Sequence, residues 1–183
     1  MEDGLLDIFS LPFKILVGLT AVLGILLVFL TGVTITTNQN AKTSASRLAS
    51  SIRDYGRDNA GFQGARSRTS GQITTFSEEL KETVKKCNFK APVEIRITFT
   101  GGANNYVSGG VILDTIVNPE TGDLSGIDSV NALRLNKGDT INVSVTPYYR
   151  YYTWQNNPSK WYQGQPIQTS GTVSAYIKSK LMR

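Results

Sequence analysis

Residues Ile15–Leu30 read ILVGLTAVLGILLVFL and are almost wholly apolar. They lie inside a longer run between Lys14 and Lys42 that contains no charged residue. A helix needs about 20 apolar residues to cross the hydrocarbon core of a bilayer. A helix that packs one face against the core of a small globular protein has a polar stripe, and this run has none. We therefore predict a single transmembrane helix, anchored in the cell membrane.

A cleaved secretory signal is the main alternative for this segment. Such a signal has a basic start, an apolar stretch of about 7–15 residues and a small-x-small cleavage site. The residues before the apolar run are acidic here, namely Glu2, Asp3 and Asp7, and no Ala-x-Ala pattern follows the run. We expect an uncleaved anchor.

The helical pattern continues beyond the uncharged run. Apolar residues at Ala45, Leu48, Ile52 and Tyr55 are spaced by three or four, and polar residues lie between them. This spacing is typical of one apolar face on a helix. Gly56 is a plausible C-cap. Residues 1–56 are thus predicted to form a transmembrane helix that continues as an amphipathic stem.

A loop and a second helix follow the stem. Residues 57–72 are rich in Gly, Ser, Arg and Asn and have almost nothing to bury, which predicts a loop. Thr75 and Glu78 then have the spacing of a capping box. The helix they begin has apolar residues on one face, including Cys87, and Asn88 can cap its end. Cys87 is most simply a small buried hydrophobe, with a reactive thiol as the alternative.

The remainder of the chain alternates with a period of two. Clear strands are predicted at 93–99, at 141–145 and from Ile167 to Ile177, and a looser one at 111–117. Turns are predicted at 118–122 and 136–139. Pro147 should end central pairing or mark an edge. Residues 73–183 are thus a strand-rich globular domain, and the fold class is α+β, a short helix packed on a small antiparallel sheet.

The composition argues against an enzyme. The chain has no histidine and one cysteine, which removes the usual general base, any internal disulfide and any cysteine-based metal site. No phosphate-binding loop, metal-ligand spacing or nucleophile elbow is present. We expect no catalytic activity, no cofactor and no metal.

Basic residues are scattered, and the net charge is +5. No basic stripe carries interleaved aromatics, so nucleic acid is not an expected partner. The densest basic group follows the apolar run. It suits either contact with anionic lipid headgroups or a solvated helix face and loop, and consists of Arg47, Arg53, Arg57, Arg66 and Arg68.

Two sets of residues are candidate contact surfaces. Small residues let transmembrane helices approach closely, and the stem has an apolar seam for packing, on the sheet or on another subunit. Together they predict helix-packing or assembly positions at Gly18, Thr20, Ala21, Gly24, Thr31, Leu48, Ile52 and Tyr55. Aromatic residues with polar tips are common at interfaces, and a dense group of them predicts partner binding by Tyr149, Tyr151, Trp154, Trp161 and Tyr162. Burial of part of this aromatic group in the core is the alternative, because neighbours on a strand face opposite ways.

The chain resembles type IV pilins and pseudopilins, and most closely the TadE-like group, which includes pilin-like proteins of Gram-positive mobile elements. The residues that carry the resemblance are the stem NQNAKTSASRLASSIRDYG, the segment FSEELKETVKKC, the strand pair around LRLNKGDTINVSVTPYYRY and the ending SGTVSAYIKSK. The resemblance implies a structural membrane subunit that assembles with copies of itself or related subunits into a pilus-like filament or a secretion or conjugation apparatus.

The chain departs from the prepilin pattern at its start. A prepilin has a basic leader before the glycine at its cleavage site and a Glu at the fifth mature position. Here Gly4 follows Glu2 and Asp3, and the fifth position after it is Phe9. The departure puts processing after Gly4 in doubt.

The orientation in the membrane has evidence on both sides. Lys14 lies before the span, whereas Lys42, Arg47, Arg53 and Arg57 follow it, which favours a cytoplasmic C-terminal domain. The resemblance and the Thr-, Ser-, Asn- and Tyr-rich strands favour an exterior domain, which is our prediction. The alternative function, from another class, is a membrane-anchored, adhesin-like binding module that uses its Tyr/Trp face.

Overall fold

A computed structural model describes residues 3–63, 65–66, 73–102, 108–149 and 161–174, with only the backbone described at 3–11, 65–66 and 73–74. The chain begins with helix α1, Asp3–Asp58. The elements that follow are β1 Ala65–Arg66, β2 Ile73–Thr74, α2 Phe76–Lys86, β3 Val93–Thr100, β4 Gly109–Val117, the 3-10 helix η1 Ser125–Ser129, β5 Thr140–Tyr149, β6 Tyr162–Gln163 and β7 Ile167–Thr172.

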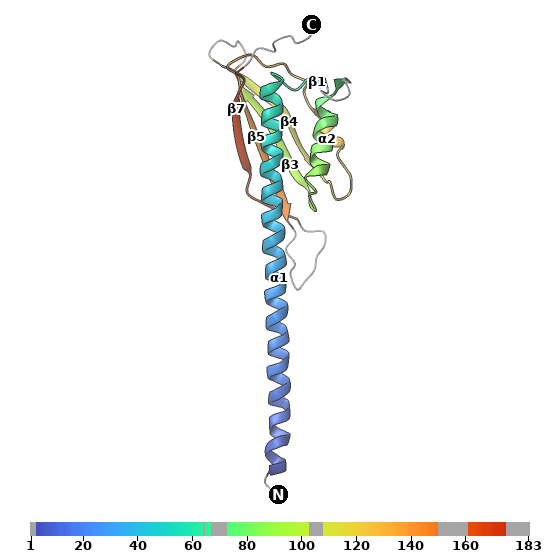
Figure 1. Cartoon of the computed structure of the whole chain (residues 1–183), viewed down its shortest axis with the longest axis vertical. Helices are drawn as coiled ribbons and strands as arrows, with labels where there is room; N and C mark the ends of the chain where they lie inside the picture. The colour runs from blue at the N-terminus through green and yellow to red at the C-terminus, as the bar shows by residue number, and fades with distance from the viewer. Residues whose placement is uncertain (1–2, 64, 67–72, 103–107, 150–160, 175–183) are drawn as a thin grey trace.

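Helix α1 dominates the shape of the molecule (Figure 1). Its 56 residues give a length of about 84 Å at 1.5 Å per residue. The upper part of the helix packs along β5 and β7, whereas the lower part projects from the domain without a neighbouring element. The end of the domain from which the lower helix emerges is called the foot below.

The sheet is antiparallel, in the order β4-β3-β5-β7, and the short β6 pairs with the far end of β5 beside β7. Its register places Ile95 opposite Val145 and Ile97 opposite Val143, so that inward-facing residues of neighbouring strands meet. The helices cover one face of this sheet, and Figure 1 shows both on the same side. The predicted α+β arrangement of a long helix, a short helix and a small antiparallel sheet is confirmed.

One hydrophobic core joins the stem to the sheet. Val93, Ile95 and Ile97 are fully buried on β3, in alternation with more exposed neighbours. Leu48 and Ile52 of α1 are equally buried in the same cluster. The core therefore draws on both the stem and the strand-rich segment that sequence analysis separates into 1–56 and 73–183.

Helix α2 forms where its capping signals lie. The Thr75 hydroxyl accepts from the Glu78 N–H, and the Glu78 carboxylate accepts from the Thr75 N–H at 3.0 Å, which completes the predicted capping box. Asn88 follows the C-cap in the left-handed region, with φ of 51°. The Ser44 hydroxyl donates to the Cys87 carbonyl at 2.9 Å and ties the end of α2 to the stem.

The predicted end of the first helix at Gly56 is wrong. The helix continues to Asp58, and the reversal comes at Ala60, with φ of 47°, and Gly61. The Gly61 N–H donates to the Gly56 carbonyl at 2.9 Å, a bond typical of a Schellman ending. Gly56 is needed for packing instead, because a β-carbon there would lie 2.5 Å from Cζ of Phe62.

The segment 57–72 buries more than its composition indicates. Phe62 is among the largest fully buried side chains, and Ala60 is buried beside it. The Phe62 ring meets the Phe76 ring edge-on at 4.8 Å between centroids. The expectation of a loop with almost nothing to bury is therefore wrong for residues 60–62, whose apolar side chains complete the core.

Pro147 does not end the strand it occupies. β5 continues to Tyr149, but Pro147 and Val93 form the last pair in the register between β5 and β3, beyond the end of the pairing with β7 at Val145. The Pro147 carbonyl accepts a hydrogen bond from the Gly164 N–H, so it faces β6 and β7. In a strand the nitrogen and the carbonyl of one residue point to the same side, and the Pro147 nitrogen therefore faces β6 and β7 as well. That side has a gap in pairing between Gln163 and Ile167, and the missing N–H therefore costs no ladder bond.

The other predicted elements, apart from the length of the last strand, agree with the structure within the described residues. The looser strand at 111–117 lies in β4, and the turn at 118–122 closes with reciprocal bonds between Asn118 and Asp123. The last strand is shorter than predicted, because β7 ends at Thr172 and Val173 and Ser174 follow it outside the strand. Val173 is nevertheless fully buried, as predicted. The inward positions expected at Ala175 and Ile177 lie outside the described residues.

Candidate functional site

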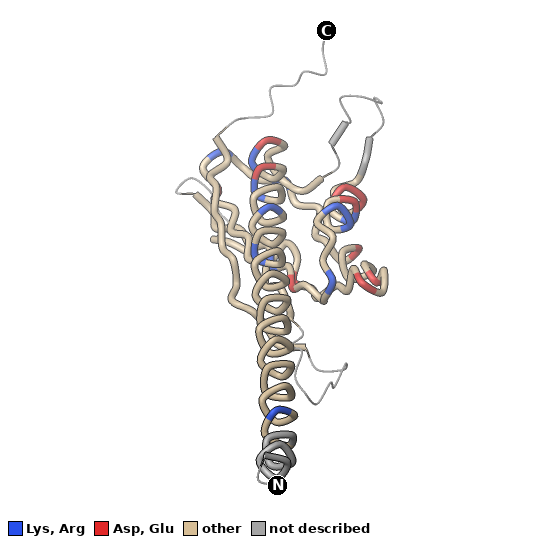
Figure 2. Tube along the Cα trace, turned by 60° about the horizontal axis from the view of Figure 1, so that its bottom comes forward, with Lys and Arg blue, Asp and Glu red and all other residues tan. Residues whose placement is uncertain are grey.

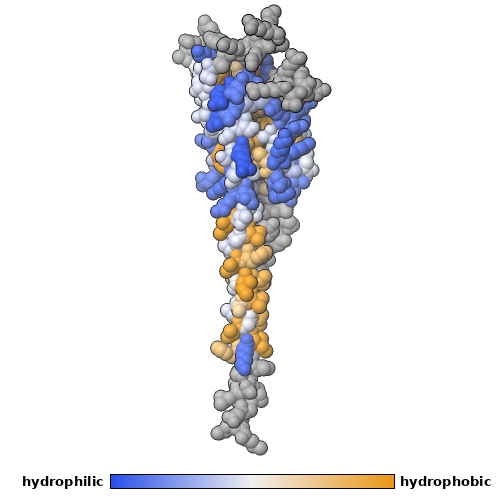
Figure 3. Space-filling view, viewed as in Figure 1, coloured by the Kyte–Doolittle hydropathy of each residue, from blue (hydrophilic) through white to orange (hydrophobic). Residues whose placement is uncertain are grey.

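The lower part of α1 is the most unusual surface of the molecule. Its apolar side chains from Phe13 to Phe29 are mostly more than half exposed. The most apolar window of the helix has a mean hydropathy of 2.6 and no residue buried inside the chain. Figure 3 shows an apolar shaft below a largely hydrophilic head, and Figure 2 shows that charges gather on the head. By length and composition this helix could cross a membrane.

The predicted small residues on this shaft are open to an incoming partner. A β-carbon added at Gly18 or Gly24 would meet nothing within 4 Å, and Ala21 is exposed. The hydroxyls of Thr20 and Thr31 donate to the carbonyls of the preceding turn at 2.9 and 2.7 Å. These hydroxyls therefore have their hydrogen-bond partners within the helix, and the side chains on this surface are small and mainly apolar.

The three stem residues of the predicted assembly face have another role. Leu48 and Ile52 are 0% and 2% exposed, in the core between α1 and the sheet. Tyr55 is partly buried, with its ring 4.8 Å from that of Phe76, and its hydroxyl donates to the Gln63 carbonyl at 2.9 Å. Burial and the nearby Glu79 raise the pKa of Tyr55 to about 12. The structure therefore agrees with a helix-packing role for these residues, and it corrects their use as an assembly surface because the chain's own domain covers them.

The predicted aromatic surface is divided by the fold. Tyr149 is 6% exposed and belongs to the interior, which corrects its assignment to a partner-binding face. Trp161 is half-buried and Tyr162 is 43% exposed. Tyr151 and Trp154 lie outside the described residues. Tyr149, its neighbour Tyr148 and Trp161 all line the cleft described next.

A cleft of about 640 Å³ opens at the foot of the domain. No motif in the sequence indicated it. It is lined by residues of α1 between Thr37 and Arg47 and by the segment 87–91 between α2 and β3. Tyr148 and Trp161 close one side, and Glu120 is its acidic residue. The cleft combines residues far apart in the chain, which is why sequence reasoning missed it.

Cys87 lines this cleft and is half-buried. Burial raises the pKa of its thiol, and the positive charge of Arg47 opposes that effect only in part. A thiol with a raised pKa has little nucleophilic thiolate at neutral pH. The geometry therefore favours packing over reactivity, in line with the first of the two interpretations drawn from the sequence.

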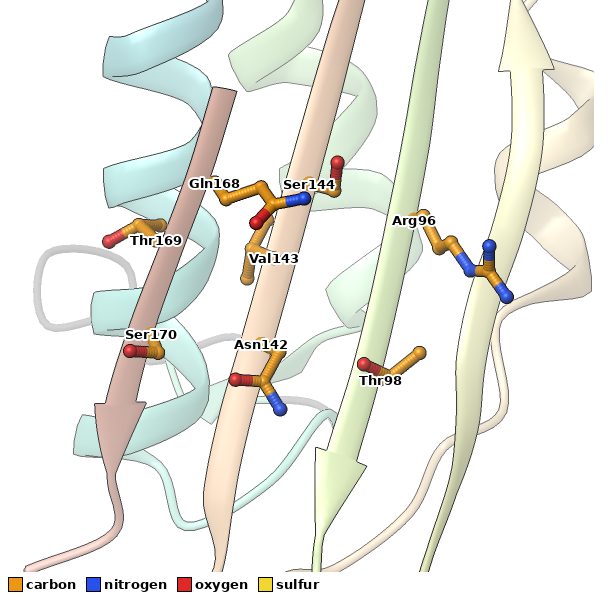
Figure 4. Close-up of a pocket in the computed structure, with 8 residues that line it drawn as sticks. All are labelled: Arg96, Thr98, Asn142, Val143, Ser144, Gln168, Thr169 and Ser170. Carbon is orange, nitrogen blue, oxygen red and sulfur yellow. The ribbon is translucent and has the colours of Figure 1, made fainter. Parts of the chain in front are cut away.

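The outer face of the sheet carries polar side chains. Figure 4 shows side chains of three neighbouring strands projecting from the face away from the helices, around a hollow of about 520 Å³. Their partners lie within the face: Arg96 pairs with Asp114 at 3.5 Å, and Asn142 donates to Thr100 at 3.3 Å. Within the described residues, no group of three His, Cys, Asp or Glu side chains could hold a metal ion.

Comparison with known protein families, curated proteins and solved structures finds no match to this chain. The class of protein therefore follows from the fold alone. It is an α+β protein in which a small helix-covered sheet is carried on a long apolar helix that could span a membrane.

Proposed function

We propose that the protein is a pilin- or pseudopilin-like structural subunit, anchored in the cell membrane and assembling through the lower part of α1. The observation that carries the proposal is the contrast between the two halves of that helix. The upper half has its apolar side chains buried in the domain, whereas the lower half leaves them uncovered on every side. An apolar shaft of this size is stable only in lipid or against other helices.

The dimensions support insertion into a bilayer. The uncharged run from Ile15 to Ala41 is roughly 40 Å long at 1.5 Å per residue, whereas a hydrocarbon core is about 30 Å thick. Backbone groups along the run are bonded within the helix, and the threonine hydroxyls bond to the preceding turn, as at Thr34 and Thr36. A span in lipid must satisfy its polar groups internally in this way.

The same stretch supports assembly beyond simple anchoring. Gly18, Ala21 and Gly24 are uncovered within the chain, and small residues allow close approach of helix backbones where the hydrophobic effect gives no drive. The expected partners are other copies of the chain or related pilin-like subunits. In this proposal the domain lies on the exterior, and the assembly is a pilus-like filament or a secretion or conjugation apparatus.

A membrane-anchored binding module is the second candidate. The polar outer face of the sheet favours it, because polar side chains of β3, β5 and β7 line a hollow there. A binding module needs the helix only as an anchor. The two candidates therefore differ in whether the shaft makes specific contacts.

Gly24→Leu separates the two candidates. Leucine keeps the shaft apolar and helical but holds a neighbouring backbone away, so we expect the complexes extracted in mild detergent to become smaller and less stable. Val22→Leu is the matched control, because position 22 lies on nearly the opposite side of the helix. Native mass analysis and electron microscopy of the extracts give the readout. Complexes of equal size and stability for Gly24→Leu and the wild type would exclude this face as an assembly surface.

A further inference from the structure

Helix α1 has a stretch that lies between the proposed membrane span and the core of the domain. With the hydrocarbon core beginning at Ile15, about 20 residues carry it to near Thr34. The helix is tied to the domain from Ser44, whose hydroxyl donates to a carbonyl at the end of α2 at 2.9 Å. Ala45 is the first fully buried residue among the described side chains of α1. Residues 35–43 therefore form roughly 14 Å of helix between the lipid and the core.

The cleft of about 640 Å³ at the foot, called the foot cleft below, borders this stretch. Thr37, Asn40, Ala41 and Thr43 line it, so this side of the helix faces an open space and not a packed layer of side chains. Ile35, one turn lower, is 51% exposed. The stretch therefore has room to bend and little packing to lose when it does.

The sequence at this level favours a helix only weakly. Residues 31–40, called the joint below, read TGVTITTNQN, and Gln39 is the one strong helix former among them. Threonine, valine and isoleucine lose side-chain freedom in a helix, asparagine competes for backbone hydrogen bonds, and glycine loses the most backbone freedom. The span below the joint is rich in leucine and the stem above it in alanine, which are both strong helix formers. The joint is thus the weakest part of this region of α1.

Threonine hydroxyls weaken the helical bonding of the joint further. The hydroxyls of Thr31, Thr34, Thr36 and Thr37 each donate to the carbonyl four residues earlier, at 2.7–2.9 Å. Each of these carbonyls shares its oxygen between a side chain and the backbone N–H of the helix. Such side-chain bonds slightly destabilise helices and often bend them. Their concentration in the joint marks the place where α1 bends most readily.

Asn38 favours opening of the joint. Its side-chain oxygen is buried and has no hydrogen-bond partner among the described residues. A buried polar atom without a partner costs free energy, which hydration recovers. When the helix opens at this residue, water can reach the oxygen, so the open form gains a hydrogen bond that the closed form lacks.

We infer that the joint is a hinge, in which residues 35–40 reversibly lose their helical hydrogen bonds and let the domain tilt on a shaft fixed in the bilayer. The inference rests on the proposed membrane insertion of α1. Because these residues lie above the hydrocarbon, water can bond to the backbone groups that opening frees. α1 is helical throughout the joint, so the open form is the minor state of the hinge.

The test uses the full-length chain in nanodiscs of phosphatidylcholine. Hydrogen exchange followed by mass spectrometry measures how often each part of α1 opens. We expect the amides of residues 35–40 to exchange about tenfold faster, or more, than those of residues 46–53, where the same helix packs on the sheet.

Variants that strengthen the joint provide the matched comparison. The triple variant Thr34→Ala, Thr36→Ala, Thr37→Ala should slow exchange in the joint by about tenfold, because alanine is a much better helix former than threonine. The double variant Ser46→Ala, Ser51→Ala makes a similar change in the stem and should leave exchange in the joint unchanged.

A second measurement reports the tilt of the domain. Nitroxide labels at Val28→Cys in the shaft and Ser170→Cys on β7, in a Cys87→Ala chain, lie roughly 40 Å apart, because Arg53 of α1 contacts the neighbouring Thr169. Pulsed electron paramagnetic resonance gives the distribution of this distance. We expect a broad distribution in the otherwise wild-type chain and a narrower one when the three joint threonines are alanine.

The outcomes separate failure of the hinge from failure of the anchor. Exchange at residues 35–40 as slow as at residues 46–53, or the same distance distribution with threonine and with alanine in the joint, would overturn the inference and leave the proposed function standing. Flotation after an alkaline wash reports insertion independently. A chain that fails to float contradicts the proposed function and the hinge together.

Discussion

The ring of Phe62 lies directly against Gly56, so that a β-carbon at position 56 would be 2.5 Å from the Phe62 Cζ atom and 2.7 Å from the Ile141 Cδ1 atom. Gly56 lies inside α1, two residues before its end, where glycine is a poor helix former. Glycine at position 56 thus lowers the helix propensity but allows the Phe62 and Ile141 side chains to pack closely against the helix backbone. This contact closes the top of the core, where the end of α1, the chain reversal and β5 meet.

Gly56→Ala should destabilise the domain despite its better helix propensity. Overpacking costs about 1–3 kcal/mol, whereas the gain in propensity is at most about 1 kcal/mol. Chemical denaturation of the purified protein measures the difference. In a Phe62→Leu background the same substitution should be less harmful, because the shorter side chain makes room. An equal loss in both backgrounds would show that Phe62 is not the neighbour that resists the β-carbon.

The capping box of α2 predicts a pH effect. Hydrogen bonds from Thr75 hold the pKa of the Glu78 carboxyl below its usual range. A carboxyl whose folded pKa is depressed contributes stability above its unfolded pKa, near 4.3, and that contribution is lost as the pH falls through the folded value. Glu78→Gln should therefore flatten the acid side of the stability profile. Glu82→Gln, an equal charge change on the same helix, serves as the control.

Removal of the cap itself should be visible at neutral pH. Thr75→Ala leaves the first N–H groups of α2 without their side-chain acceptor and should cost about 0.5–2 kcal/mol. Because Phe76, Leu80 and Val84 bury the helix in the core, the loss should appear in global unfolding and not only as local fraying. Retention of full stability by Thr75→Ala would mean that core packing alone holds α2.

Orientation is best measured at Ser170. This residue is exposed on the outer face of β7, whereas Cys87 is half-buried and burial raises the pKa of its thiol. A membrane-impermeant maleimide applied to intact cells should label Ser170→Cys in a Cys87→Ala background. The native Cys87 should react slowly under the same conditions. Labelling of position 170 only after cell lysis would place the domain in the cytoplasm and contradict the pilin-like proposal.

Local signals predict local structure well in this chain. The capping box at Thr75 and the alternation at Val93, Ile95 and Ile97 depend on neighbours a few residues away, and both are found where expected. Gly56 shows the limit, because a glycine near a helix end looks like a cap until its distant neighbours Phe62 and Ile141 are known.

The same limit holds for the candidate surfaces. Leu48 and Tyr149 have the side chains of an interface, yet the tertiary structure decides that they face the core. The foot cleft could not be found by spacing, because its walls at Arg47, Lys90 and Trp161 come from three distant segments. The uncovered shaft, by contrast, follows from local composition alone.

Two shortened chains test how far the stem belongs to the domain. A chain beginning at Lys42 keeps every core residue found in α1, from Ala45 to Ile52, and should fold without a membrane. A chain beginning at Gly71 keeps α2 and all strands of the main sheet but loses Leu48, Ile52 and Phe62. Each of these side chains contributes about 1.5–3 kcal/mol by burial, or about 5–9 kcal/mol together.

Such a loss is comparable to the whole stability of a small domain, about 5–15 kcal/mol. It would also expose the inner faces of β5 and β7, against which α1 packs. We therefore expect the chain from Gly71 to be unfolded or aggregated, and the chain from Lys42 to show a cooperative thermal transition by circular dichroism. A cooperative transition in the shorter chain would show that the stem is only attached to the sheet and is not part of its core.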